Sequence, residues 1–113
     1  MLIAITREVS PAITECELTH LERTPIDLET ARQQHRAYEV VLGSLGVRVI
    51  SLPEAPELPD AVFVEDTGIV LEECAILTRP GAASRQPEVE SIAWVLSTFR
   101  TLLRVQAPGT LDG

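Results

Sequence analysis

Aromatic residues are scarce in this sequence, and cysteines are scarcer still. Only 4% of the 113 residues are aromatic and 45% are hydrophobic, so the core has to be built mainly from Val, Ile, Leu and Ala. The two cysteines, Cys16 and Cys74, give neither a disulfide framework nor metal-ligand spacing. No apolar run approaches the ~20 residues of a membrane span, and no signal peptide is visible. We therefore expect a cytoplasmic protein with no metal site and no membrane partner.

Positive charge is also in short supply. Nine basic residues stand against seventeen acidic ones, a net charge of -8. This balance argues against nucleic acid as a partner, because phosphate binding needs a basic face. A negative surface potential attracts cationic ligands, although the same acidic residues can simply keep a protein soluble.

The first half of the sequence predicts a strand, a helix and a second strand. Residues 2–5 form a short apolar run typical of a buried strand. Asp27 is placed to cap a helix, Gly46 is placed to end it, and residues 47–52 alternate as a strand does. Between the caps, one apolar stripe steps by three and four residues, with Arg32, Gln33, Arg36 and Glu39 largely on the wet side. The stripe consists of Leu28, Ala31, His35, Tyr38, Leu42 and Leu45.

The second half predicts strand, strand, helix, strand, after a proline-containing loop at residues 53–59. Residues 68–71 and 74–77 form a hairpin around Glu72 and Glu73. Ser84 is the expected N-cap of the next helix, and residues 102–105 resume a strand. The helix carries an apolar stripe of Val89, Ile92, Ala93, Leu96 and Phe99. The fold class is therefore α/β.

The densest polar cluster is Asp60, Glu65 and Asp66, around an apolar stretch at residues 61–64 that we expect to be a buried strand. If extended, Asp60 and Asp66 share a face but lie about 20 Å apart, so a turn is needed to bring them together. Such carboxylates can hold a divalent metal, act as an acid and base pair or clamp a guanidinium. A solvated loop explains them equally well.

The remaining candidate residues have ordinary explanations. His35 lies on an apolar stripe and is expected to be a satisfied, partly buried histidine. Cys16 and His20 could form a nucleophile pair, but no orienting third group is suggested. Arg79 and Arg85 flank a helix start and could receive a carboxylate there, or form surface salt bridges of little energetic weight.

Four stretches resemble the dimethylarginine dimethylaminohydrolase family, in its order and at its spacing. They are Leu58-Pro59-Asp60-Ala61-Val62-Phe63-Val64-Glu65-Asp66, Leu77-Thr78-Arg79-Pro80-Gly81-Ala82-Ala83-Ser84-Arg85, Pro108-Gly109-Thr110-Leu111-Asp112-Gly113, and Cys16-Glu17-Leu18-Thr19-His20, where the family has its substrate-covering loop. The likeness extends over all 113 residues.

This resemblance implies both a fold and a reaction. The fold is the N-terminal part of a five-bladed α/β propeller of ββαβ units, with residues 1–113 as the N-terminal fragment of one amidinotransferase-like domain. The family's hydrolases act on C–N bonds of linear amidines and convert N-omega-methylated arginines to citrulline plus methylamine or dimethylamine. A cysteine thiolate attacks the guanidinium carbon, a histidine helps water to release citrulline, and no cofactor takes part.

The resemblance also implies site residues. Asp66 would accept N–H bonds from the substrate guanidinium, with Asp60 and Glu65 contributing to the same region. Leu18 would offer its backbone carbonyl to the amino-acid end of the substrate, and Arg85 would bind its carboxylate. Related arginine deiminases have an Arg where this chain has Glu65, which favours methylarginine as the substrate.

The family's catalytic apparatus is only partly represented. Asp112 looks like the acidic residue that orients the catalytic histidine, but that histidine and the nucleophilic cysteine are expected beyond Gly113. We expect a truncated chain that has no hydrolase activity alone. Two alternatives remain: a non-catalytic module that binds cationic amino acids or self-assembles through an unpaired sheet edge, and a relative of the arginine deiminases or amidinotransferases.

Overall fold

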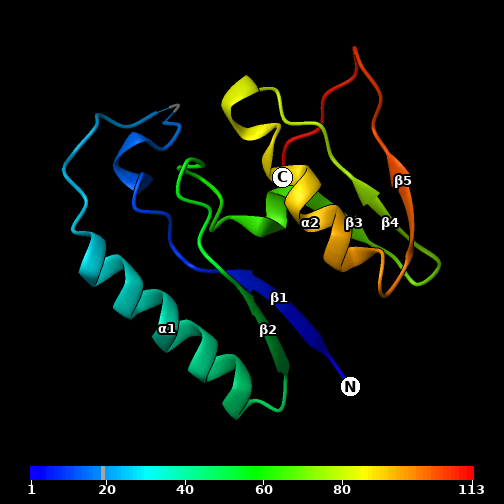
Figure 1. Cartoon of the computed structure of the whole chain (residues 1–113), viewed down its shortest axis with the longest axis horizontal. Helices are drawn as coiled ribbons and strands as arrows, with labels where there is room; N and C mark the ends of the chain where they lie inside the picture. Colours follow the sequence, from blue (N-terminus) through cyan, green and yellow to red (C-terminus); the bar gives the residue numbers. More distant parts are fainter. Residues whose placement is uncertain (19) are drawn as a thin grey trace. The chain divides into compact units, whose positions relative to one another are not determined.

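The computed structural model describes residues 1–18 and 20–113, and the chain divides into two compact units, Met1–Val62 and Phe63–Gly113. Figure 1 shows the elements of each unit. Thr19, which belongs to the stretch that resembles the substrate-covering loop, lies outside the described residues. In the described part of the chain, no helix is long and apolar enough to cross a membrane.

The first unit is a β-α-β arrangement, as predicted. Strand β1 (Ile3–Arg7) and strand β2 (Arg48–Leu52) are parallel neighbours, and helix α1 (Leu28–Ser44) connects them. A 3-10 turn, η1 (Ile13–Glu15), precedes the helix. In the strand register Thr6 lies opposite Ser51, so both side chains point to the same face of the sheet.

Helix α1 begins and ends at the predicted residues. The Asp27 side chain accepts a hydrogen bond from the Thr30 N–H at 2.7 Å, which satisfies one of the free donors of the first turn. Gly46 has a φ of 82°, a left-handed conformation that glycine adopts without steric penalty. The Val47 N–H then bonds the Leu42 carbonyl at 3.2 Å and closes the helix end.

The buried side of α1 is more polar than predicted. Tyr38 and Leu45 are 55% and 74% exposed, whereas the Glu39 side chain is only 15% exposed. Its Oε1 accepts hydrogen bonds from Thr6 Oγ1 at 2.6 Å and Ser51 Oγ at 2.8 Å. The prediction of a solvated Glu39 was therefore wrong, because a helical stripe cannot show that the facing strands carry hydroxyl donors.

The second unit is the predicted strand-strand-helix-strand arrangement. Strands β3 (Gly68–Val70) and β4 (Cys74–Leu77) form an antiparallel hairpin, and β5 (Thr101–Arg104) joins β4 in parallel. Helix α2 (Glu88–Leu96) connects β4 to β5. The predicted order of elements from residue 68 onward is confirmed.

The two faces of this sheet differ in their cover. On the α2 side, Ala75 and Leu77 are completely buried. On the other side, Ile69, Ile76 and Leu103 are aligned across the three strands, and Ile69 and Leu103 remain 43% and 54% exposed. One face of the sheet is thus a core and the other is a partly exposed apolar surface.

Two local predictions were wrong. Residues 61–64 do not form a strand: the chain turns at residues 59–62 and continues as a 3-10 helix, η2 (Val64–Thr67). Thr67 Oγ1 donates to the Val64 carbonyl at 2.6 Å and stabilises that tight turn. Nor does Ser84 cap α2. It lies in a separate 3-10 turn, η3 (Ala83–Arg85), and Pro87, which needs no backbone donor, precedes the helix.

Candidate functional site

The second unit brings two of the predicted site residues into direct contact. Asp66 lies in η2 and Arg85 at the end of η3. Arg85 Nη1 donates to Asp66 Oδ2 at 2.7 Å, and Arg85 Nη2 donates to the Phe63 carbonyl at 3.3 Å. A carboxylate that we predicted to bind a guanidinium therefore already binds one, from the same chain.

A residue that is not among the predicted site residues completes this cluster. Glu88, the first residue of α2, is 2% exposed. Its Oε2 accepts from Arg85 Nε at 3.0 Å and its Oε1 from Arg85 Nη2 at 2.9 Å. The signal that could have found it is the spacing of three residues, at which oppositely charged side chains commonly pair.

The electrostatics of Arg85 follow from these contacts. Burial lowers the pKa of the guanidinium, but the hydrogen bonds and charges of Glu88 and Asp66 outweigh burial and raise it. Arg85 is therefore a permanent cation between two carboxylates. Charge-assisted bonds of this kind, with a bidentate arm, are among the strongest that proteins make.

Residues 78–81, which follow β4, contact both Asp66 and Asp112. The Asp66 backbone carbonyl accepts from Thr78 Oγ1 at 2.7 Å. Both Asp112 oxygens accept from the Gly81 N–H, at 3.2 and 3.3 Å, and the Leu111 N–H bonds the Arg79 carbonyl at 2.8 Å. Gly113 lies against Asp66 so closely that any side chain there would clash with its carboxylate.

Asp60 and Leu18 belong to the first unit. Asp60 is 5% exposed, and its two oxygens accept from the Glu17 N–H at 3.2 and 3.1 Å. This contact holds the backbone immediately before Leu18, whose side chain is 38% exposed. Arg23 Nη2 supports the same loop by donating to the Cys16 carbonyl at 2.7 Å.

The other candidates occupy varied environments. Glu65 is exposed in η2, and His20 is exposed as well. Cys16 is 8% exposed, and both cysteines are free thiols. His35 is partly buried, as predicted, but it is not the satisfied histidine that we expected, because its buried Nε2, at 3.0 Å from Glu39 Oε1, has no hydrogen-bond partner in the described part of the chain. Within the described residues, no cluster of His, Cys, Asp and Glu is arranged to hold a metal ion.

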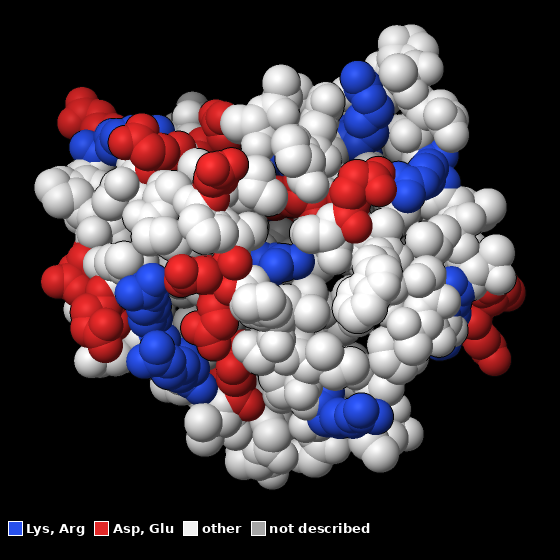
Figure 2. All heavy atoms as spheres, in the orientation of Figure 1, with Lys and Arg blue, Asp and Glu red and all other residues white. Residues whose placement is uncertain are grey.

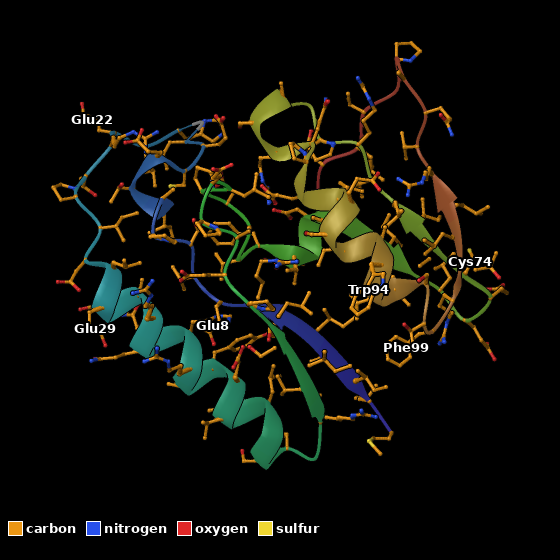
Figure 3. All side chains as sticks on the ribbon, viewed as in Figure 1. Glu8, Glu22, Glu29, Cys74, Trp94 and Phe99 are labelled. Atoms are coloured by element: carbon orange, nitrogen blue, oxygen red, sulfur yellow. The ribbon has the colours of Figure 1, made fainter. Side chains whose placement is uncertain are left out.

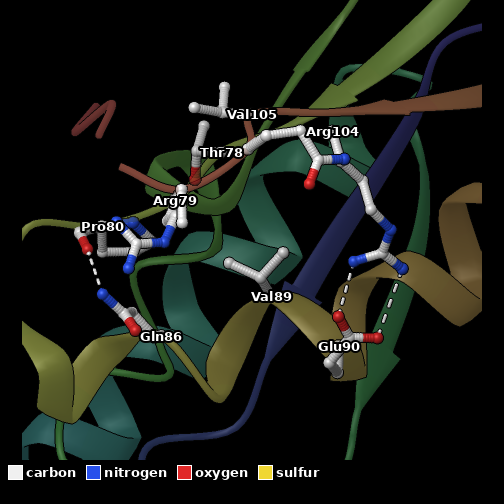
Figure 4. Close-up of a pocket in the computed structure, with 10 residues that line it drawn as sticks. Thr78, Arg79, Pro80, Gln86, Val89, Glu90, Arg104 and Val105 are labelled. Carbon is white, nitrogen blue, oxygen red and sulfur yellow. Dashed lines mark hydrogen bonds and ion pairs between the residues drawn. The ribbon is translucent and has the colours of Figure 1, made fainter. Parts of the chain in front are cut away.

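A pocket of about 310 Å³ lies elsewhere in the second unit, and its lining contains the candidate Arg79 but none of the residues that the family resemblance assigns to the site (Figure 4). Its polar groups are already engaged: Arg104 pairs with Glu90, and the Gln86 amide donates to the Pro80 carbonyl at 3.0 Å. The Asp66, Arg85 and Glu88 cluster contains two of the residues that the family resemblance predicts to bind the ligand, and it is for this reason the stronger candidate for a ligand site.

Comparison with known sequences gives a consistent result. The chain is 38% identical over 111 residues to an N(G),N(G)-dimethylarginine dimethylaminohydrolase of Streptomyces coelicolor. The aligned residues cover 97% of this chain and 43% of the relative. It is 41% identical over 88 residues to the enzyme of the same name from Pseudomonas aeruginosa, covering 76% of this chain and 35% of the relative. No protein-family profile matches. The chain spans less than half the length of these relatives.

Solved structures agree with the sequence relatives. A cysteine-to-serine variant of the Pseudomonas aeruginosa dimethylarginine dimethylaminohydrolase, bound to citrulline, superposes with a TM-score of 0.92 and 35% identity over 98% of this chain and 44% of that one. The N-terminal domain of a cyanobacterial arginine dihydrolase, bound to product, has a TM-score of 0.86 at 20% identity, over 99% of this chain and 42% of that one. The second likeness shows a shared fold.

Proposed function

Because this chain belongs to the dimethylarginine dimethylaminohydrolase family, we propose that it forms part of a hydrolase that converts N-omega-methylated arginines to citrulline and methylamine or dimethylamine. The observation that carries the proposal is the contact between Arg85 Nη1 and Asp66 Oδ2 at 2.7 Å. Asp66 presents a carboxylate to a guanidinium, and Arg85 presents a guanidinium to a carboxylate. A methylated arginine carries both complementary groups.

The proposed roles follow that chemistry. Asp66 accepts N–H bonds from the ligand guanidinium, with Asp60 and Glu65 contributing to the same region, and Arg85 binds the ligand carboxylate. Leu18 offers its backbone carbonyl to the amino-acid end; its loop is anchored by Asp60. A bidentate carboxylate matches the planar fork of a guanidinium better than it matches an ammonium.

We propose that the chemical step needs residues that do not match any in this chain. In the family's covalent mechanism, a cysteine thiolate attacks the guanidinium carbon, the alkylamine leaves, and water then releases citrulline. Cys16 and Cys74 do not occupy the nucleophile's position, and His20 and His35 do not occupy that of the histidine. Asp112 is our candidate for the residue that orients the missing histidine.

The test separates binding from turnover. The 113-residue chain is titrated with asymmetric dimethylarginine by calorimetry, and citrulline formation is measured in the same solution against a buffer blank. We expect saturable binding without citrulline, because the proposed ligand-binding residues Asp66 and Arg85 lie in this chain, whereas the family's nucleophile and a second substrate-binding arginine match no residue of it. Binding no tighter than that of free glycine would contradict the proposed site, and citrulline above the blank would contradict the proposed lack of turnover.

The same family likeness supports finer proposals about architecture and location. We propose that both units belong to one amidinotransferase-like domain and that the ββαβ unit of residues 68–104 is one blade of a five-bladed propeller. The two free thiols fit the reducing cytoplasm that we propose as its location.

A second candidate function is self-assembly. The observation that favours it is the apolar sheet face of the second unit, where Ile69, Leu71 and Leu103 are 43%, 45% and 54% exposed. Exposed apolar patches of this kind often mark interfaces. Sedimentation of the chain over a tenfold concentration range tests it, since a monomer at all concentrations would exclude this candidate.

A further inference from the structure

Glu88 is the most deeply buried carboxylate of the candidate cluster, and the proposed function gives it no task. It is 2% exposed, and taking a carboxylate out of water carries a large penalty unless its oxygens are satisfied. Here both oxygens accept from Arg85, at 3.0 and 2.9 Å. Glu88 is thus bound through both of its oxygens to Arg85, the residue that we propose to bind the ligand carboxylate.

The geometry of this pair fixes the direction of Arg85. Glu88 engages Nε and Nη2, which lie on one edge of the guanidinium. A bidentate pair of this kind sets the plane of the fork as well as its position. Nη1 is then left pointing at a carboxylate oxygen, Asp66 Oδ2, at 2.7 Å.

A second pair on the same helix shows that this burial is not a general property of α2. Glu90 also accepts from an arginine, Arg104, but the two side chains are 69% and 42% exposed. The corresponding values for Glu88 and Arg85 are 2% and 13%. Glu90 therefore provides a matched control for Glu88.

We infer that Glu88 is a positioning residue, which holds the Arg85 fork so that Nη1 is presented to a ligand carboxylate. The inference rests on the proposed function, and in this structure the Asp66 carboxylate occupies the place of that ligand group. A methylated arginine exchanges both partners: its carboxylate replaces Asp66 on Nη1, and its guanidinium replaces Arg85 on Asp66. The exchange breaks one ion pair, and only a ligand that carries both groups forms two in its place.

The experiment compares Glu88→Gln with Glu90→Gln in the 113-residue chain. Each protein is titrated with asymmetric dimethylarginine and with the corresponding amine that lacks the α-carboxylate. For Glu88→Gln we expect about a tenfold loss of affinity for dimethylarginine, the size of one charge-assisted contact, and no change for the amine. For Glu90→Gln we expect no change with either ligand.

The two ligands distinguish positioning from a merely structural role. If Glu88→Gln weakens both ligands equally, Glu88 only supports the fold and the inference is wrong. If it weakens neither, Arg85 does not need Glu88, and the inference is equally wrong. Circular dichroism melting shows whether each variant folds. If Glu88→Gln does not fold, Arg85→Lys is used in its place. A loss of affinity for dimethylarginine but not for the amine supports the need for a guanidinium held in a fixed orientation. Any other pattern contradicts it.

A ligand-free measurement separates this inference from the proposed function. All nine basic residues of the chain are arginines, so side-chain Nε–H signals of the ¹⁵N-labelled protein form a small set. We expect the Arg85 Nε–H to exchange slowly with solvent in the unmodified chain and in Glu90→Gln, and rapidly in Glu88→Gln. If the chain binds neither ligand, the proposed function fails while slow exchange still supports the hold of Glu88 on Arg85. Fast exchange in the unmodified chain refutes that hold.

Discussion

At the scale of single residues, burial decides what a charged contact contributes. The second unit contains two Glu–Arg pairs whose glutamates lie on α2, one pair almost fully buried and one exposed. The sequence presents Glu88 and Glu90 alike, as acidic residues in a first helical turn. Both glutamates accept two hydrogen bonds from an arginine, but only Glu88 is buried, and its arginine also contacts Asp66, a predicted site residue.

Removing the arginine of each pair should therefore have unequal effects. Arg85→Met leaves Glu88 buried without its main counter-charge, which destabilises a folded protein by about 3–5 kcal/mol. Arg104→Met removes an exposed pair of about 1 kcal/mol or less. The measurement is urea-induced unfolding followed by circular dichroism, and equal midpoints for the two variants would contradict the expectation.

Glu39 makes a prediction about pH. Burial raises the pKa of its carboxyl, but the hydrogen bonds from Thr6 and Ser51, together with nearby His35, outweigh burial and lower it below the usual 4.5. The unfolded chain therefore binds this proton at a higher pH than the folded chain does. Glu39 stabilises the fold above about pH 4.5, and the stabilisation is lost as the pH falls through the lowered value.

We expect Glu39→Gln to reduce the dependence of the free energy of unfolding on pH between about pH 5 and pH 3. The control is Glu29→Gln in the same helix, since Glu29 is exposed and projects from the α1 side away from the strands (Figure 3). Denaturant titrations at several pH values provide the measurement. A steeper or unchanged pH dependence in Glu39→Gln would show that the three contacts do not lower its pKa.

At the scale of elements, the sequence predicted a helix end correctly where that end is set by interactions between residues close together in the chain. The caps of α1 at Asp27 and Gly46 were predictable because an N-cap carboxylate and a left-handed glycine act within a few residues. The η2 turn at Val64–Thr67 was not, because the apolar residues at 61–64 fit a buried strand and a buried turn equally well. The start of α2 was misplaced for a similar reason, since Ser84 and Pro87 both fit a helix start.

Two glycines of the α1 region should respond oppositely to the same substitution. Gly43 lies inside α1 and Gly46 has a φ of 82°, and an added Cβ meets no atom within 4 Å at either position. Gly43→Ala should raise the free energy of unfolding by up to about 1 kcal/mol through helix propensity. Gly46→Ala should lower it by about 1 kcal/mol through backbone strain. Thermal unfolding tests both, and the same sign for both would contradict the assigned conformations.

At the scale of the whole molecule, charge is the property that the sequence reports most directly. The net charge is -8, and on the face shown in Figure 2 several of the Arg side chains lie close to Asp and Glu side chains. Such a chain should attract a cation over long distances. The proposed ligand, dimethylarginine, carries a net positive charge, whereas citrulline has a neutral side chain of similar shape.

We therefore expect salt to affect the two ligands differently. Raising sodium chloride from about 20 mM to about 500 mM shortens the screening length several-fold, so the affinity for dimethylarginine should fall by more than that for citrulline. Calorimetric titration at both salt concentrations measures the ratio. An equal change for the two ligands would show that the net charge does not contribute to ligand choice.

The sequence by itself determined the α/β class, the order of strands and helices in both units, the caps of α1 and the acidic balance, because periodicity, capping and charge are local or additive properties. Its resemblance to one enzyme family also named Asp66 and Arg85. Only the tertiary structure decided that these two residues bind each other and that Glu39 faces two strand hydroxyls. It also decided that Glu88, which is 2% exposed, holds Arg85. The partners of Asp66 and Glu39 come from segments far apart in the chain, which no spacing rule along the sequence can identify, and the three-residue spacing of Arg85 and Glu88 indicates a pair but not its burial.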